Sequence, residues 1–162
     1  MPLPAAGAPL PPFTTQAAVS GREVSNATLK GKRAVLVVHG SKTTDAAKEA
    51  SKAVRARFTP KEVASASIVD LHGFAGMWRR VAEAQVRQNY EKLAGKVKEA
   101  SPGEDPADWV VICPDWDQSV CKALGVDQPD EAPAAIVVGA DGKVVGVATG
   151  KGLGEQVVKL LG

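Results

Sequence analysis

Few residues of this 162-residue chain can carry redox, metal or base-stacking chemistry. It contains two cysteines, Cys113 and Cys121, and two histidines. Two cysteines are too few for a disulfide framework, and their spacing matches no zinc motif. Aromatic residues make up 4% of the chain, which argues against a surface that stacks nucleic-acid bases. The formal net charge of +2 is too small to indicate binding to nucleic acid or to an anionic surface.

Long apolar segments and cofactor motifs are also missing. No stretch approaches the roughly 18 apolar residues that cross a bilayer. The first residues, MPLPAAGAPLPPF, have neither the basic nor the apolar region of a signal peptide. As written, the sequence predicts a cytoplasmic protein without a membrane span, and a periplasmic one if a leader was removed before Met1. Walker, GxSxG and HExxH motifs are absent, so we expect no cofactor.

The composition fits one domain behind a proline-rich lead. Residues 1–12 hold five of the eleven prolines, which predicts an extended, flexible segment. Residues 13–162 are 150 further positions without an internal repeat, enough to bury a hydrophobic core.

Strand and helix patterns alternate after a short hairpin around a Ser-Gly pair. Residues Ala34–His39 predict a central parallel strand, because both faces of this segment are apolar. The other expected elements are a helix over 46–58, a strand over 64–71, a helix over 76–100, a strand over 109–113, a helix over 117–124, a hairpin of 135–138 with 143–148, and a helix over 154–161. This order predicts an α/β fold with a mixed central sheet flanked by helices.

The longest periodic segment is residues 76–100. Its apolar side chains recur at helical spacing and predict one buried stripe, formed by Trp78, Ala82, Val86, Tyr90, Leu93 and Val97. Arg79, Arg80 and Arg87 lie mostly off this stripe and form either a solvated face or a surface for an acidic partner. Trp78 and Trp116 are either core anchors or exposed docking residues, and the sequence leaves both alternatives open.

Four short motifs stand in the order found in one protein family. The lead APLPPF at 8–13 resembles the "APxF" of peroxiredoxins and TlpA-like thiol-disulfide proteins, and LKGK at 29–32 resembles their segment before the central strand. PDWD at 114–117 with ALGV at 123–126 is similar to their "DPDG…ALGV", and APAA at 132–135 with GADGK at 139–143 to their "VPTTFLIDADGKV". The chain therefore resembles the redoxin branch of the thioredoxin-like superfamily, near the small bacterial YtfJ-type proteins.

The resemblance implies a thioredoxin-like fold but not its chemistry. It places the active-site cysteines between Lys42 and Ala47, where this chain has none. Thr43 and Ala46 stand at the expected positions, and neither side chain can form a thiolate. Dithiol exchange at this position is therefore excluded.

The resemblance also implies a peptide-binding groove. Pro133 matches the family's cis-proline, so we expect a cis bond after Ala132. The residues that would form the groove are Lys42, Thr43, Thr44, Asp45, Ala132 and Pro133. On this basis we expect a non-catalytic module that binds a protein or peptide. The sequence predicts no particular oligomeric state.

Two other functions stay open. In one, Cys113 alone or with Cys121 acts in an atypical thiol oxidoreductase or peroxidase, which requires exposed thiols of lowered pKa. The structural alternative is that both cysteines are small buried residues of the core. In the other, a metal chaperone uses His39, His72 and Cys113, which would lie at the carboxyl ends of three neighbouring parallel strands. Asp70 and Asp115 end adjacent strands and are expected to come close.

Overall fold

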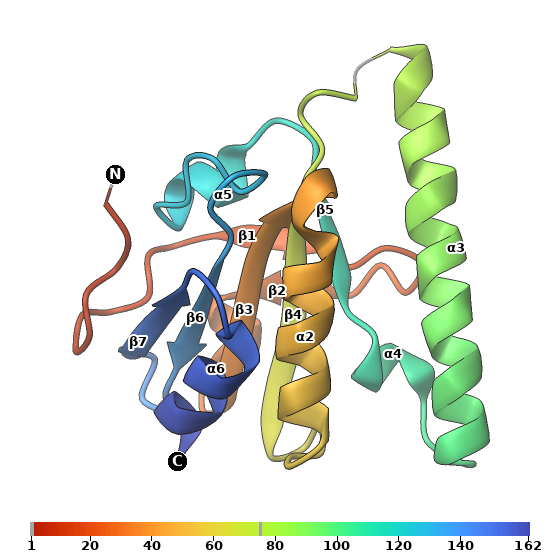
Figure 1. Cartoon of the computed structure of the whole chain (residues 1–162). Coiled ribbons are helices and arrows are strands. Elements are labelled where there is room, and N and C mark those ends of the chain that lie inside the picture. Colours follow the sequence, from red (N-terminus) through yellow and green to blue (C-terminus); the bar gives the residue numbers. More distant parts are fainter. Residues whose placement is uncertain (1, 75) are drawn as a thin grey trace.

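A five-stranded mixed sheet forms the centre of the protein (Figure 1). The computed structural model describes residues 2–74 and 76–162. The strands are β3 (Arg33–Gly40), β4 (Val63–Asp70), β5 (Ile112–Asp115), β6 (Ala134–Val138) and β7 (Val144–Thr149), in the spatial order β5-β4-β3-β6-β7. β3, β4 and β5 are parallel, whereas β6 is antiparallel to β3 and to β7. The predicted mixed sheet and its central strand are confirmed.

β3 lies in the interior because both of its faces are apolar. Residues Ala34–Val38 are fully buried, and alternate side chains point to opposite faces. Val35 and Val37 pack beneath two helices, α2 (Thr44–Arg55) and α6 (Leu153–Leu161), which lie side by side on one face of the sheet (Figure 1). Leu36 and Val38 belong to the core on the other face.

Shorter elements cover that second face. They are the two-stranded sheet of β1 (Thr14–Gln16) and β2 (Glu23–Ser25), the helix α1 (Asn26–Leu29) and the helix α5 (Ser119–Ala123). The proline-rich lead also contributes, because Leu10 is buried and the N–H groups of Gly7 and Leu10 donate to the carbonyls of Val144 and Gly142, at 2.7 and 3.0 Å. The flexibility expected for residues 1–12 stays a prediction.

The helix α3 (Met77–Ala100) runs beside the β5 edge of the sheet (Figure 1). Its buried side chains are Ala82, Val86, Tyr90 and Ala94. The predicted stripe is confirmed from Ala82 to Tyr90, and Leu93 and Val97 continue it as half-buried side chains packed against the core. Trp78, by contrast, is 61% exposed. The 24 residues of α3 span roughly 36 Å, whereas the 4 residues of β5 span only about 13 Å. The first turn of α3 therefore has little sheet to cover. No helix among the described residues is long and apolar enough to cross a membrane.

One predicted strand is shifted. Trp109 was expected in a strand over 109–113, but it ends a short helix, α4 (Pro106–Trp109), and β5 begins at Ile112. The carboxylate of Asp105 accepts a hydrogen bond from the N–H of Ala107 at 3.0 Å, and Pro106 occupies the first helical position. This capped turn shortens the strand, so β5 pairs with β4 only from Ser67 onwards.

Candidate functional site

The junction of β3 and α2 is the position at which the resemblance placed the cysteines. A single 3-10 turn, Ser41–Thr43, connects Gly40 to the first residue of α2. Lys42 and Asp45 are exposed, while Thr43 and Thr44 are half-buried. The side chains at this junction are hydroxyls, an ammonium and a carboxylate, so no group here can exchange a disulfide.

The loop before β6 packs directly on this junction. The Pro129 carbonyl accepts hydrogen bonds from the N–H of Gly40 at 3.2 Å and from the Thr43 hydroxyl at 2.7 Å. The Asp130 carboxylate accepts a hydrogen bond from the N–H of Lys42 at 2.9 Å. A Cβ added to Gly40 would lie 2.9 Å from the Cα of Asp130, so this close approach requires glycine. Three donors before α2, the N–H groups of Gly40 and Lys42 and the Thr43 hydroxyl, are therefore occupied by the protein's own chain.

The predicted cis-proline is wrong. The described residues contain no cis peptide bond, and the bond between Ala132 and Pro133 is trans. The trans isomer is the one that a bond to proline prefers, by about 0.5–1 kcal/mol. The bond follows a turn closed by a 2.8 Å hydrogen bond from the N–H of Ala132 to the carbonyl of Gln128. This turn brings Pro129 to the junction and leaves Ala132 exposed. No hydrogen bond in the described part of the chain joins residues 132–133 to residues 42–45, so the two halves of the expected groove do not bond to each other.

Both cysteines are core residues. Cys113 and Cys121 are fully buried in the cluster that contains Leu36. Burial raises the pKa of the Cys113 thiol to about 12. Burial also raises the pKa of Cys121, and the carboxylates of Asp115 and Asp70 raise it further. Because the thiolate is the reactive form, this environment opposes thiol chemistry at either residue.

The three residues considered for a metal site do not come together. Cys113 pairs in register with Ile68, two positions before the carboxyl ends of the strands. His39 is buried, and its Nδ1 donates to the Gly40 carbonyl at 2.9 Å. Burial lowers the pKa of His39. Within residues 2–74 and 76–162, no group of three His, Cys, Asp or Glu residues has an arrangement suited to a metal ion.

Two buried carboxylates end β4 and β5, at the place where the sequence predicted their proximity. Asp70 and Asp115 are paired in register. Asp70 accepts hydrogen bonds from the His72 N–H at 3.1 Å, the His72 ring Nδ1 at 2.7 Å and the Gln118 amide at 2.9 Å. Asp115 accepts one from the N–H of Cys121 at 2.8 Å. Each carboxylate thus anchors a neighbouring segment. The contribution of Gln118 has no local sequence signal, because this residue lies 48 positions from Asp70.

Exposed apolar side chains gather at the start of α3. Met77, Trp78 and Val81 are 80%, 61% and 55% exposed, and their spacing places them together on the helix. We call these three residues the α3 patch. Trp116, by contrast, is half-buried, and its ring lies 4.5 Å from the guanidinium of Arg79. The structure therefore resolves the open alternative: Trp116 is a packing residue and Trp78 is exposed.

Comparisons with known proteins support the fold. No family model and no curated protein matches the sequence. Among solved structures, the chain is similar to DsbF from MTB (19% identity, 92% of each chain covered, TM-score 0.58). It is also similar to the exposed lipoprotein thioredoxin Etrx1 from Streptococcus pneumoniae (13% identity, 93% of this chain and 97% of that one, TM-score 0.62). A third match is a secreted Mycobacterium tuberculosis disulfide oxidoreductase homologous to E. coli DsbE (17% identity, 92% and 94%, TM-score 0.54). The chain therefore has the thioredoxin-like fold that its motifs predicted.

Proposed function

We propose that this thioredoxin-like protein is a non-catalytic protein-binding module, and that its partner contacts the α3 patch. The observation that carries the proposal is the exposure of Trp78 on a helix that is longer than the strand beside it. Tryptophan is among the residues most enriched at the energetic centres of protein interfaces. Contiguous exposed apolar side chains are uncommon on proteins that have no partner.

The absence of usable thiol chemistry supports a binding function over an enzymatic one. The β3–α2 junction carries no cysteine, and both thiols of the chain are buried with raised pKa values. The junction is also closed by Pro129 and Asp130. For this reason we place the partner on the α3 patch and not in the groove over Lys42–Asp45.

The charges around the patch indicate the partner's chemistry. Arg79 is already engaged, because it donates to Glu83 at 3.1 Å and lies over Trp116. Arg80 and Arg87 are exposed, and no ion pair among the described residues includes either of them. The amino end of a helix also favours negative charge. The partner is therefore a protein segment with apolar side chains flanked by carboxylates.

The location of the protein bears on where this partner is found. Two of the proteins of similar fold are described as secreted or as an exposed lipoprotein. These descriptions favour the periplasmic alternative for this chain over the cytoplasmic one.

The test uses two positions of similar chemistry on different faces. A photo-reactive amino acid at position 78 should cross-link one host protein that the same group at position 145 does not. Val145 is the matched control, because it is an exposed apolar residue, 43% exposed, on β7. The affinity of the identified partner is then measured by calorimetry with the wild type and with the Trp78→Ser and Val145→Ser variants. We expect Trp78→Ser to weaken binding by at least about tenfold, and Val145→Ser to leave it unchanged.

Three results contradict the proposal. If the Trp78→Ser and Val145→Ser variants bind the partner equally well, the interface does not include the α3 patch. A cross-link between two copies of this chain shows self-association instead of partner binding. Reduction of insulin disulfides at the rate of an ordinary thioredoxin shows that the protein is an enzyme.

A further inference from the structure

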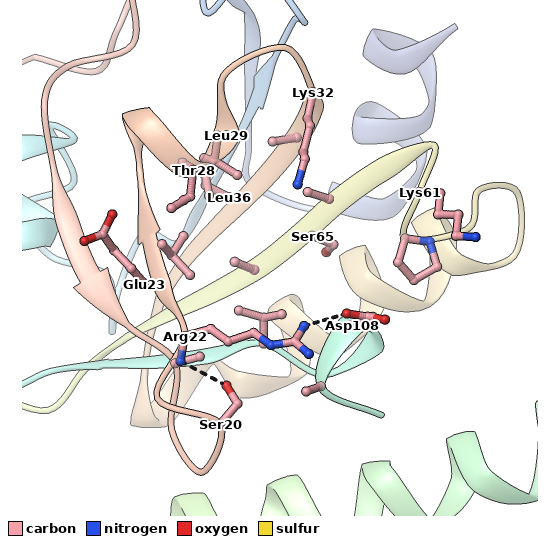
Figure 2. Close-up of a pocket in the computed structure, with 18 of the residues that line it drawn as sticks. Ser20, Arg22, Glu23, Thr28, Leu29, Lys32, Leu36, Lys61, Ser65 and Asp108 are labelled. Carbon is pink, nitrogen blue, oxygen red and sulfur yellow. Dashed lines mark hydrogen bonds and ion pairs between the residues drawn. The ribbon is translucent and has the colours of Figure 1, made fainter. Parts of the chain in front are cut away.

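A cavity lies at the opposite end of β3 and β4 from the closed junction. Its volume is about 520 Å³, within the range of roughly 300–1,000 Å³ found for ligand pockets. Its floor is the sheet itself, where Ala34 pairs in register with Ala64, and Leu36 with Ala66. Ala34, Leu36 and Ala66 are buried beneath the cavity, and Ala64 is the half-buried side chain of the sheet that reaches its surface. The β1–β2 hairpin, α1 and α4 form the surrounding walls (Figure 2).

One side of the cavity offers backbone hydrogen-bonding groups. The N–H of Ser67 donates to the Val111 carbonyl at 2.9 Å, towards the β5 side of β4. In a parallel strand, alternate residues direct their backbone groups to the same neighbour, so those of Ser65 point to this side as well. β4 and β5 pair only from Ser67 onwards, and within residues 2–74 and 76–162 no strand pairs with Ser65 on this side. Ser65 lines the cavity at this open edge.

Lys32 supplies a positive charge at the mouth. Figure 2 shows its amine directed towards the cavity and that of Lys61 directed away from it. Lys32 takes part in no ion pair among the described residues. The other nearby cation, Arg22, is held by Asp108 and, at 2.9 Å, by Asp105. Of the acidic lining residues, Glu23 accepts from the Ser25 hydroxyl at 2.9 Å, and Glu104 is exposed at the rim.

We propose that this cavity binds an elongated apolar molecule with a single anionic group, of the class of medium-chain fatty acids. The hydrocarbon chain lies against the half-buried Ala64, Leu29 and Val111, where each buried methylene favours binding. The carboxylate lies at the mouth and pairs with the Lys32 ammonium. The site is separate from the α3 patch, so this inference does not depend on the proposed function.

The first experiment tests the chemistry of the ligand. The full chain is titrated calorimetrically with decanoate and with decanol, which has the same chain length and no charge. We expect saturable 1:1 binding of decanoate, with decanol at least about tenfold weaker. Lys32→Met should reduce the affinity for decanoate to that for decanol, whereas Lys61→Met, the matched control, should leave it unchanged. Absence of saturable decanoate binding, or equal effects of the two lysine variants, overturns the proposal.

The second experiment tests the position of the ligand. Ala64→Leu places three more carbons in the cavity and should abolish decanoate binding. Should this variant fail to fold, the wild-type protein still gives an answer, because amide chemical shifts report the site directly. Decanoate should perturb the amides of Ala34, Ala64 and Ser65. Perturbations confined to α3 or to the β3–α2 junction would show binding elsewhere and overturn the assignment.

Discussion

The two ends of the parallel strands β3 and β4 are built in opposite ways. At the carboxyl end, Gly40 is covered by Pro129 and Asp130, and Asp70 is surrounded by donors from His72 and Gln118. At the amino end, three alanines leave a cavity in the same sheet. Ligands of open α/β sheets normally collect at the carboxyl end. In this chain that end is part of the packed interior, and the free volume lies at the other end.

Thiol reactivity is the most sensitive measure of how tightly the carboxyl end of the sheet is packed. The pKa of Cys113, raised from 9.0 to about 12, leaves roughly a thousandfold less thiolate at pH 8 than an exposed thiol has. Ellman's reagent should therefore react with both cysteines of the folded protein at least about a thousandfold more slowly than with those of the protein unfolded in about 8 M urea. A Ser119→Cys variant, with an exposed thiol at the start of α5, should add one fast reaction. Fast reaction of the wild type would contradict the comparison.

Glycine substitution tests how closely the junction is packed. Gly40→Ala forces a Cβ against Asp130, and overpacking of this kind costs about 1–3 kcal/mol in the free energy of unfolding. Urea unfolding monitored by circular dichroism measures this loss. Gly73→Ala is the matched control, because a Cβ there meets no atom within 4 Å. If both variants unfold at the wild-type urea concentration, Pro129 and Asp130 do not close the junction in solution.

Two alanine-to-leucine variants compare a packed layer with the hollow one. Ala135 is fully buried beneath α2 and α6, so Ala135→Leu should lower the free energy of unfolding by about 1–3 kcal/mol. Ala64 is half-buried and borders the cavity, so Ala64→Leu should change it by less than about 1 kcal/mol or raise it. Thermal and urea unfolding of the two variants measure the difference. Equal destabilisation would mean that the amino end is as tightly packed as the layer under α2.

The smallest expected effect is a pH dependence from His39. Burial lowers its pKa in the folded state, so below the unfolded value of about 6.5 the unfolded chain binds more protons. The stability that His39 contributes is therefore complete above that pH and is lost as the pH falls. The slope is at most about 1.4 kcal/mol per pH unit. Unfolding free energies at pH 7.5 and 5.5 should differ less in His39→Gln than in the wild type, and an identical dependence would refute this assignment.

The sequence predicted the central sheet because its signals are local. Both faces of Ala34–His39 are apolar, and the turn at Asp141–Gly142 separates β6 from β7. The proximity of Asp70 and Asp115 followed from their positions at the ends of adjacent strands. The late start of β5 also has a local sequence signal, because Asp105 and Pro106 form the cap and the first turn of a helix. The residues from Trp109 onwards are β-prone, so the strand pattern in the sequence begins earlier than the strand itself.

The closed junction could not be predicted in the same way. The bonds of Thr43 and Lys42 to the loop at 129–130 connect positions more than 80 residues apart, and no local pattern encodes them. The exposure of Trp78 is likewise set by the length of the strand beside α3 and not by helical periodicity. For this reason the expected groove and the expected stripe both extended further than the structure allows.

The short β5 has a second consequence, which concerns aggregation. It leaves the edge of β4 without a neighbouring strand before Ser67 in the described part of the chain, and an unpaired edge can recruit a strand from another molecule if it becomes exposed. In the folded protein Val63 and Ser65 are buried. The guanidinium of Arg55 donates to the Val63 carbonyl at 2.9 Å and lies beside the Trp109 ring of α4, so it occupies one acceptor of that edge. Burial lowers the pKa of Arg55 only to about 10, and the side chain stays charged at neutral pH. A fixed charge beside an unpaired edge discourages edge-to-edge pairing when that edge opens, so we expect resistance to aggregation to depend on a residue that lies outside both proposed binding surfaces.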